Sequence, residues 1–161
     1  MIELGILADD LTGGMMVASL LEREGVDCPL VTSVDELESL ANSTATAVVV
    51  ARKIRLIPAK DARKEAIKTV QALKSIGCKR FYYKYCATFD STSKGNIGPI
   101  AEAMMEELDA SRTIFCPAFP EYTVTIFQGR MFLGNTPLGE SFKKNDPVTP
   151  MTNSNLVEVL A

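Results

Sequence analysis

Short apolar segments alternate with amphipathic segments along most of the chain. The first, residues 1–8, is apolar or glycine apart from Glu3 and ends at a turn, which is typical of a buried parallel strand. Similar segments predict four more strands, at residues 26–32, 46–51, 79–83 and 112–116. From Thr123 to Leu133 the pattern instead predicts an antiparallel hairpin that turns at Gln128–Gly129.

The segments between the strands have helical periodicity. In the first of them, Thr12 is the expected N-cap, two glycines open the helix and Gly25 ends it. The most regular helix runs from Pro58, its expected first residue, to Gly77. Three more helices are predicted, at residues 33–42, 97–108 and from 152 or 154 to 160.

Five successive strand–helix steps predict an α/β fold. We expect a doubly wound, mostly parallel sheet in a Rossmann-like three-layer arrangement, with the hairpin near residues 123–133 as an antiparallel addition. The chain is long enough for a substantial core, and residues 1–161 are interpreted as a single domain.

Composition narrows the range of partners. A net charge of −3, without a basic stripe, argues against nucleic-acid binding. No apolar run approaches the length of a membrane span, and no basic region precedes the apolar N-terminal residues. We therefore expect a cytoplasmic protein that binds neither nucleic acid nor membrane.

The residues available for catalysis are also restricted. Histidine is absent, which excludes Ser-His-Asp and Cys-His catalysis and most zinc enzymes. The four cysteines are scattered without a C-x-x-C pair, which argues against a zinc ribbon or a thioredoxin-like redox site. We expect no metal site on this chain.

Charged residues gather where the predicted strands end. Asp9 and Asp10 follow the first strand, Arg55 and two cations before it follow the third, and Lys84 follows the fourth. Open α/β sheets bind ligands at the carboxyl ends of their strands, so these side chains form a candidate site with an anion clamp. Two alternatives stay open, because acidic residues also stabilise a helix N-terminus without a ligand and surface cations are often only solvated.

A long polar loop follows Lys84. Residues 85–99 are dense in hydroxyls and glycines and run into a predicted helix, so they offer N–H and O–H groups to a polar or anionic ligand. The loop lacks the G-x-x-x-x-G-K-[ST] spacing of a P-loop. The alternative is a capped surface turn, although loops of this length in compact domains are usually functional or disordered.

Four segments together resemble the N-terminal domain of the four-carbon acid sugar kinases, the family of threonate, erythronate and 3-oxo-tetronate kinases. They match in order and spacing over nearly the whole chain, and residues 88–99 are the most specific. The resemblance implies a Rossmann-like domain that holds the sugar acid and a separate C-terminal domain that binds ATP. The segments are Ala8–Gly13, Arg55–Pro58, Lys84–Thr92 with Gly95–Pro99, and Asp146–Met151.

The residue types suit such a substrate. Arg55 can clamp a carboxylate with two parallel donors, and Lys84 supplies a point charge. Asp9 and Asp10 can accept from sugar hydroxyls, and either could remove the proton of the attacking hydroxyl. By resemblance, we predict Asp9 and Asp10 as catalytic residues, and as substrate contacts Asp9, Asp10, Arg55, Lys84, Tyr85, Cys86, Ala87, Asp90, Ser91 and Asn96.

The chain departs from the family at several positions. Met16 stands where an acidic residue is common, Ala87 where a Ser is common, and Asp146 where a His is frequent. Thr123–Val124 replaces the usual Gly-Arg pair.

The ATP domain of the family is absent from the 161 residues, either because they are a fragment or because they are a free-standing divergent relative. The expected partners are a small sugar acid and a C-terminal nucleotide-binding domain in cis or in trans, and a homo-oligomer stays open. ATP and Mg²⁺ are implied for the full-length enzyme and no cofactor for this chain alone, which we expect to be inactive without the ATP domain.

The sequence has two rival interpretations. A haloacid-dehalogenase-like phosphatase has a D-x-D-x-T motif after a strand, but Asp9 and Asp10 are adjacent, so the spacing fails. The other rival is a sugar-acid-binding or regulatory module that kept the pocket and lost the chemistry. The missing ATP domain favours this module if the chain is the whole gene product.

Overall fold

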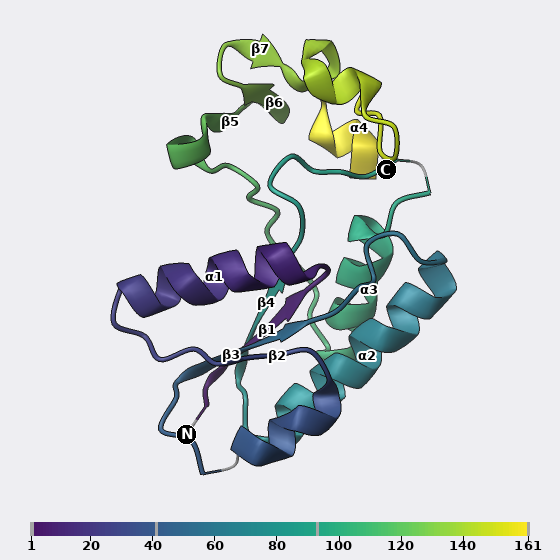
Figure 1. Ribbon diagram of the computed structural model, residues 1–161. Coiled ribbons are helices and arrows are strands. Elements are labelled where there is room, and N and C mark those ends of the chain that lie inside the picture. Colours follow the sequence, from purple (N-terminus) through teal and green to yellow (C-terminus); the bar gives the residue numbers. More distant parts are fainter. Residues whose placement is uncertain (1, 41, 93, 161) are drawn as a thin grey trace.

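The computed structural model describes residues 2–40, 42–92 and 94–160. Met1, Ala41 and Ser93 lie outside these residues; the sequence assigns them to the first strand, to the helix at residues 33–42 and to the polar loop. An α/β body carries a small lobe, residues 119–160, and the chain crosses between the two parts through residues 85–92, 94–96 and 112–118 (Figure 1).

The body is built on a four-stranded parallel sheet in the order β2-β3-β1-β4. Apolar side chains on both faces of β1 and β3 are buried, as expected of a parallel sheet covered on both sides. Ala8 pairs with Ala51 and with Lys84, so three strands end at the same level. The strands are β1 (Leu4–Ala8), β2 (Leu30–Val31), β3 (Ala47–Ala51) and β4 (Arg80–Lys84).

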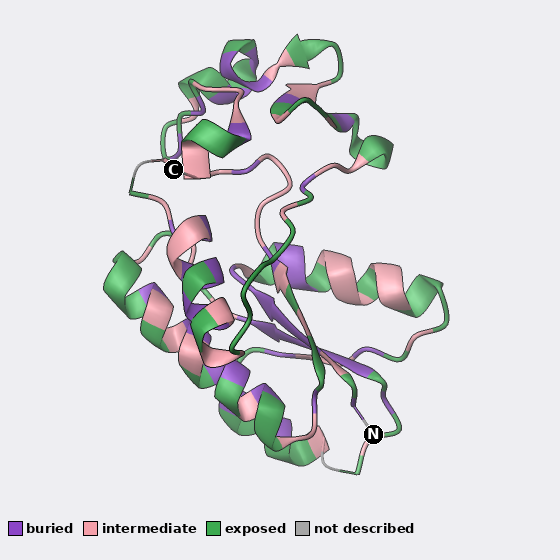
Figure 2. Cartoon of the chain, turned by 180° about the vertical axis from the view of Figure 1, so that it is seen from behind, coloured by how far each residue is buried: buried purple, intermediate pink, exposed green. Residues whose placement is uncertain are grey.

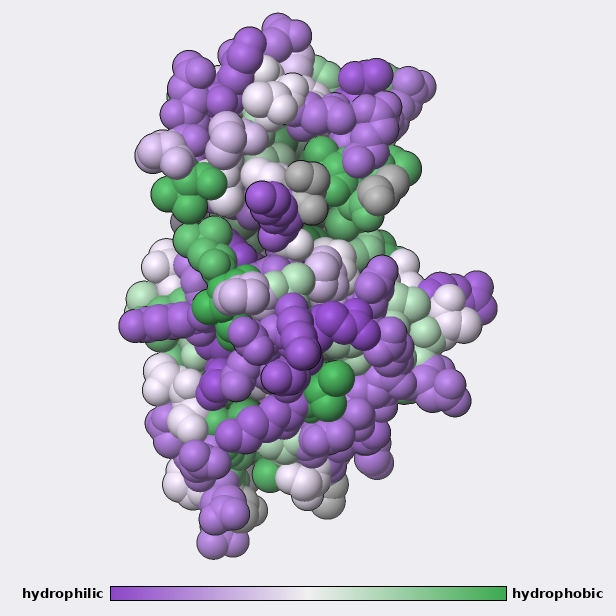
Figure 3. Space-filling model, turned by 90° about the vertical axis from the view of Figure 1, so that its right-hand side faces the viewer, coloured by the Kyte–Doolittle hydropathy of each residue, from purple (hydrophilic) through white to green (hydrophobic). Residues whose placement is uncertain are grey.

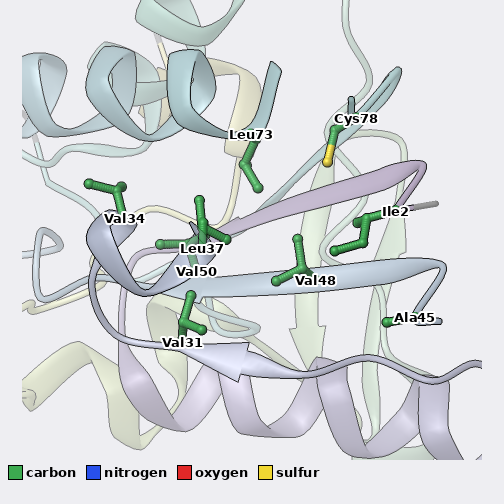
Figure 4. Close-up of a cluster of buried hydrophobic side chains, with 9 residues drawn as sticks. All are labelled: Ile2, Val31, Val34, Leu37, Ala45, Val48, Val50, Leu73 and Cys78. Carbon is green, nitrogen blue, oxygen red and sulfur yellow. The ribbon is translucent and has the colours of Figure 1, made fainter. Parts of the chain in front are cut away.

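Helices cover both faces of this sheet, which confirms the doubly wound α/β fold (Figure 1). Helix α1 (Leu11–Arg23) packs on one face, while the 3-10 helix η1 (Val34–Leu40), α2 (Ala59–Ser75) and α3 (Ile97–Glu107) pack on the other. Figure 4 shows nine buried side chains on the face of the sheet that η1 and α2 cover, where Val48 and Val50 pack with Leu37 and Leu73. In Figure 2 the central strands β1 and β3 are almost entirely buried and the outer helix faces are exposed.

The predicted fifth strand, residues 112–116, is wrong. This segment passes β4 without strand pairing, so β4 is an edge strand of the described sheet. Ile114 is 87% exposed and only Phe115 packs, with its ring 5.9 Å from that of Tyr85. A buried parallel strand needs apolar cover on both faces, and this segment has it for one side chain.

The second strand is shorter than predicted. Only Leu30 and Val31 form strand β2, although the carbonyl of Pro29 accepts a hydrogen bond from Val49 N at 2.9 Å. Proline has no backbone N–H to donate to a neighbouring strand, and within sheets it is largely confined to edge strands for this reason.

The predicted hairpin is confirmed and gains a third strand. Strands β5 (Val124–Phe127) and β6 (Arg130–Leu133) are antiparallel, and β7 (Thr136–Pro137) adds to β6. Gln128 and Gly129 have φ of 48° and 76°, the pair of positive values that a type I′ turn requires. The rest of the lobe comprises η2 (Pro120–Tyr122), η3 (Leu138–Glu140), η4 (Phe142–Asn145) and α4 (Leu156–Leu160).

The small lobe has its own apolar cluster, which also takes in the loop after β4. Phe89 and Met131 are completely buried, and Leu138 and Met151 pack with them.

Seen from the side, hydrophilic residues cover most of the surface of the body (Figure 3). Within residues 2–40, 42–92 and 94–160, no helix is long and apolar enough to cross a membrane.

Candidate functional site

Asp9 lies at the carboxyl end of the central strand β1 and is held there by its backbone. Its N–H donates to Lys84 O at 3.1 Å, and its carbonyl accepts from Ile54 N at 3.1 Å and Arg55 N at 3.3 Å. These bonds join the ends of β3 and β4 to the residue between them. The Asp9 side chain is 1% exposed, so its carboxylate depends on protein partners.

Arg55 supplies the main partner. Its Nη2 donates to Asp9 Oδ1 at 2.6 Å and to Asp10 Oδ1 at 2.8 Å. The guanidinium therefore lies between the two carboxylates. No group of three His, Cys, Asp or Glu side chains converges as a metal site in the described ranges.

Asp10 has a second task at the start of α1. Its Oδ1 accepts from Gly13 N at 2.9 Å, so Asp10, and not the predicted Thr12, is the N-cap. A Cβ at position 13 would lie 2.6 Å from this oxygen and 3.5 Å from Lys84 Nζ. Glycine at this position therefore lets α1 approach both charged groups closely.

Tyr83 and Lys84 bring β4 into the site from opposite faces. The Tyr83 hydroxyl donates to Asp9 Oδ2 at 3.3 Å. Lys84 is 9% exposed, and its Nζ donates to Tyr85 O. The sheet edge thus joins two carboxylates, two cations and one phenol.

The electrostatics of the cluster follow from burial. Burial raises the pKa of Asp9, and the hydrogen bond and charge of Arg55 offset part of this rise. Burial lowers the pKa of Lys84. Burial also acts to lower the pKa of Arg55, but the Asp9 hydrogen bond and charge outweigh it and raise that pKa. Asp9 is consequently a better proton acceptor than an exposed aspartate.

Predicted contacts from the start of the polar loop line one hollow of about 200 Å³. It lies between α1, β4 and the segment that leads into the small lobe. Cys86 Sγ is 3.2 Å from Thr88 Oγ1, while the Tyr85 ring packs edge-on against Phe89 at 5.6 Å between ring centres. The predicted residues in this lining are Lys84, Tyr85, Cys86 and Ala87.

Asp90 and Ser91 lie farther along the loop. Asp90 accepts a hydrogen bond from Thr88 Oγ1 at 2.6 Å and forms an ion pair with Lys143 Nζ at 2.9 Å. Ser91 is buried beside a second groove of about 550 Å³ between the loop and residues 150–160. These two side chains therefore face the small lobe.

Asn96 is also buried, and its Nδ2 donates to three backbone carbonyls of residues 54–57. Of the three cations after β3, only Arg55 reaches the aspartates. Arg52 instead forms an ion pair with Glu65, and Lys53 is exposed.

Two residues at or near the site were missed by sequence reasoning. Tyr83 could have been found, because the residue before Lys84 in an edge strand lies beside the end of β1. Lys143 gave no local signal. Lys143 is 7% exposed and forms an ion pair with Asp146 at 2.8 Å. It also forms an ion pair with Asp90, which lies 53 positions earlier in the chain.

The chain matches the family model described as the sugar-binding N-terminal domain over residues 4–161. It is 44% identical over 157 residues to a 3-oxo-tetronate kinase of Pseudomonas savastanoi pv. phaseolicola, covering 98% of this chain and 37% of that protein. It is 43% identical to a 3-oxo-tetronate kinase of Haemophilus influenzae, of which it covers 38%. The chain therefore spans well under half the length of these relatives.

Solved structures give the same result for the fold. A Salmonella typhimurium LT2 crystal structure matches with a TM-score of 0.90 and 37% identity, over 99% of this chain and 38% of that one. A Bordetella bronchiseptica structure, a domain-swapped dimer with bound citrate, matches with a TM-score of 0.86 and 29% identity, over 99% and 40%. This chain belongs to the four-carbon acid sugar kinase family, as its sugar-binding N-terminal domain.

Proposed function

We propose that this chain is the sugar-acid-binding part of an ATP-dependent kinase for four-carbon sugar acids such as threonate, erythronate or 3-oxo-tetronate. The observation that carries the proposal is the Asp9–Arg55–Asp10 cluster beside Lys84, at the end of three parallel strands. Ligands of open α/β sheets bind at this edge. A citrate-bound relative that is 29% identical adds support, because citrate is also a small hydroxy acid.

The two cations differ in their availability to a ligand carboxylate. Arg55 already donates to both aspartates, so the ligand would bring a third carboxylate to share it with them. Lys84 has a backbone carbonyl as its hydrogen-bond partner, and an ammonium group has three donors. We therefore assign the acid end of the sugar to Lys84, with Arg55 as a secondary contact.

The hydroxyls of the sugar would face the aspartates. Asp10 is 30% exposed and can accept from a hydroxyl directly, while Asp9 lies behind it. In phosphoryl transfer the protein mainly positions the nucleophile, and a carboxylate takes the proton that the attacking hydroxyl loses. Asp10 is the better placed to touch the substrate, and Asp9 maintains the charge balance through Arg55.

Three polar side chains of the loop, those of Thr88, Asp90 and Asn96, are already bonded within the protein and offer no cradle for a phosphate. The Thr88 hydroxyl is bonded to Asp90, Asp90 is paired with Lys143, and the Asn96 amide is bonded to backbone carbonyls. A phosphate cradle needs such groups to point outward. We assign ATP to no residue of this chain and expect a C-terminal nucleotide domain to supply it.

Calorimetric titration of the folded chain with threonate and erythronate tests binding. We expect millimolar or tighter binding without ATP. Arg55→Ala should lose about tenfold or more in affinity, the equivalent of one charged hydrogen bond, and Arg52→Ala should lose little, since its partner Glu65 lies outside the cluster. Absence of heat with any four-carbon acid at millimolar concentration would refute the proposal.

An ADP-release assay separates the kinase part from a module that only binds. We expect negligible turnover by residues 1–161 alone, and turnover when the C-terminal domain of a relative is supplied. Tight sugar-acid binding without turnover in that reconstituted system would favour a binding or regulatory module. Substrate-dependent turnover by the isolated chain would mean that the nucleotide site lies on it after all.

A further inference from the structure

Asn96 is the N-terminal boundary residue of α3 and is 3% exposed. Its Nδ2 donates to Ile54 O at 2.8 Å, Arg55 O at 3.2 Å and Ile57 O at 2.7 Å. Its backbone carbonyl accepts from Ile100 N at 2.9 Å, which begins the helix. A single side chain therefore attaches the start of α3 to a segment about 40 residues earlier.

The attached segment is the one that carries Arg55. Residues 52–58, the Arg55 loop, connect β3 to α2 without regular structure. On one side, Ile54 N and Arg55 N donate to the carbonyl of Asp9. On the other side, the Asn96 amide accounts for three of the loop's carbonyls. The Arg55 loop is thus held between the end of β1 and Asn96.

We propose that Asn96 is a positioning residue that sets the place of Arg55 between Asp9 and Asp10, and that it acts on the ligand only through Arg55. The proposal rests on the proposed function for its ligand. It differs from direct contact with the sugar acid, because Nδ2, the donor atom of the Asn96 side chain, is hydrogen-bonded to the Arg55 loop.

The chemistry of the site explains the residue type. Three carbonyl acceptors surround the group, so it must be a donor, and an amide NH₂ offers two hydrogens that three acceptors can share. An aspartate of the same shape would direct oxygen lone pairs at those carbonyls. Asn96 Oδ1 is buried without a hydrogen-bond partner among the described residues, so the donor side of the amide provides the attachment.

A ligand-free experiment tests the attachment itself. Amide hydrogen exchange of Ile54 and Arg55 should accelerate about tenfold in Asn96→Ala and in the smaller change Asn96→Ser, as expected for one lost buried hydrogen bond. Exchange in β3 should stay unchanged. The control is Thr69→Val, which removes a buried bond of 2.7 Å to Glu65 O in α2 without touching the Arg55 loop. The control should leave exchange at Ile54 and Arg55 as in the wild type.

Threonate affinity then tests whether Asn96 acts through Arg55. Asn96→Ser should weaken binding about tenfold in the wild-type background and cause no further loss in an Arg55→Ala background. Thr69→Val should bind as the wild type does. Equal losses in both backgrounds would identify a direct ligand contact and overturn the proposal.

The other outcomes are also decisive. Unchanged exchange at Ile54 and Arg55, or faster exchange over the whole chain, would overturn the positioning role whatever the ligand does. Failure of both Asn96 variants to fold, with a folded Thr69→Val, would make Asn96 a residue of the general fold. If the wild type binds no four-carbon acid, the proposed function fails, while the exchange data still decide whether Asn96 holds the Arg55 loop.

Discussion

Removal of the Arg55 side chain is the most informative perturbation of the site. In Arg55→Ala, Asp9 loses its cation and keeps the Tyr83 hydroxyl at 3.3 Å as its side-chain partner in the described structure. Asp10 keeps its bond from Gly13 N. The cost should therefore come mostly from the buried Asp9 carboxylate.

The size of the effect has an upper bound. Breaking a buried ion pair by removing one partner typically costs about 3–5 kcal/mol. Asp9 can avoid being a buried, unpaired charge by taking up a proton. Protonating a carboxyl with an unfolded pKa of about 3.9 costs about 4 kcal/mol at pH 7, so the loss of stability cannot exceed this value by much. Because the Arg55 side chain is itself 20% exposed, we expect about 3 kcal/mol at pH 7.

The pH dependence identifies the group responsible. The pKa of Asp9 is already raised by burial, and loss of Arg55 raises it further. A carboxyl whose folded pKa lies above its unfolded value destabilises the protein most above the folded pKa. The penalty disappears as the pH falls toward the unfolded value. At pH 5 the same protonation costs only about 1.5 kcal/mol, which limits the loss of stability to about that value. The destabilisation by Arg55→Ala should therefore fall by half or more.

Urea unfolding of wild type and variants at pH 7 and pH 5 measures this. Arg52→Ala is the matched control and should cost less than about 1 kcal/mol, because its Glu65 partner is one-third exposed. Asp9→Asn added to Arg55→Ala should recover part of the lost stability. An Arg55→Ala effect that equals the control, or that does not shrink at pH 5, would refute the argument that Asp9 is a buried charge balanced by Arg55.

Three further predictions concern the fold around the site and in the small lobe. Gly14→Ala should destabilise by about 1–3 kcal/mol in thermal or urea unfolding, because a Cβ there would lie 2.9 Å from Ala51 Cβ and push α1 off the sheet. Gly98→Ala, also in a first helical turn but facing open space, should instead stabilise by up to about 1 kcal/mol. Hydrogen bonds from Lys143 and two backbone N–H groups hold the pKa of Asp146 below its ordinary value. The ionised Asp146 carboxylate therefore stabilises the fold at neutral pH, and this contribution is lost on acidification below about pH 4. Asp146→Asn should thus be less stable than wild type at pH 7, with a gap that narrows in acid.

The parts of the fold that were predicted correctly are those that local pattern determines. Residues 47–51 of the predicted strand 46–51 form β3 because consecutive apolar residues suit a strand buried on both faces. The hairpin follows from the need for positive φ at Gln128 and Gly129. Asp9 and Asp10 could be located as the candidate site because a parallel sheet brings its carboxyl ends to one edge.

The errors arise where distant residues decide. Residues 112–116 have a strand-like composition, yet pairing also requires cover on both faces, which Ile114 lacks. Three cations follow β3, and local pattern alone does not indicate which of them turns inward; the family resemblance singled out Arg55, and the structure shows that only Arg55 reaches the aspartates. Its direction depends on the carbonyl of Asp9 and the amide of Asn96, 46 residues before it and 41 residues after it in the chain.

The polar loop illustrates the same limit within a single segment. Its residues look alike in sequence, because hydroxyls, amides and charges are dense from Lys84 to Pro99. Lys84 joins the charged cluster, Asp90 pairs with Lys143 of the small lobe, and Asn96 braces the Arg55 loop. A motif match over such a loop identifies the segment that builds the candidate site. Only the three-dimensional contacts separate Lys84, which we propose meets the ligand, from the side chains that are bonded within the protein. Substitutions at Asp90 and Asn96 should therefore alter binding through the architecture of the site, whereas substitution of Lys84 should alter it through charge.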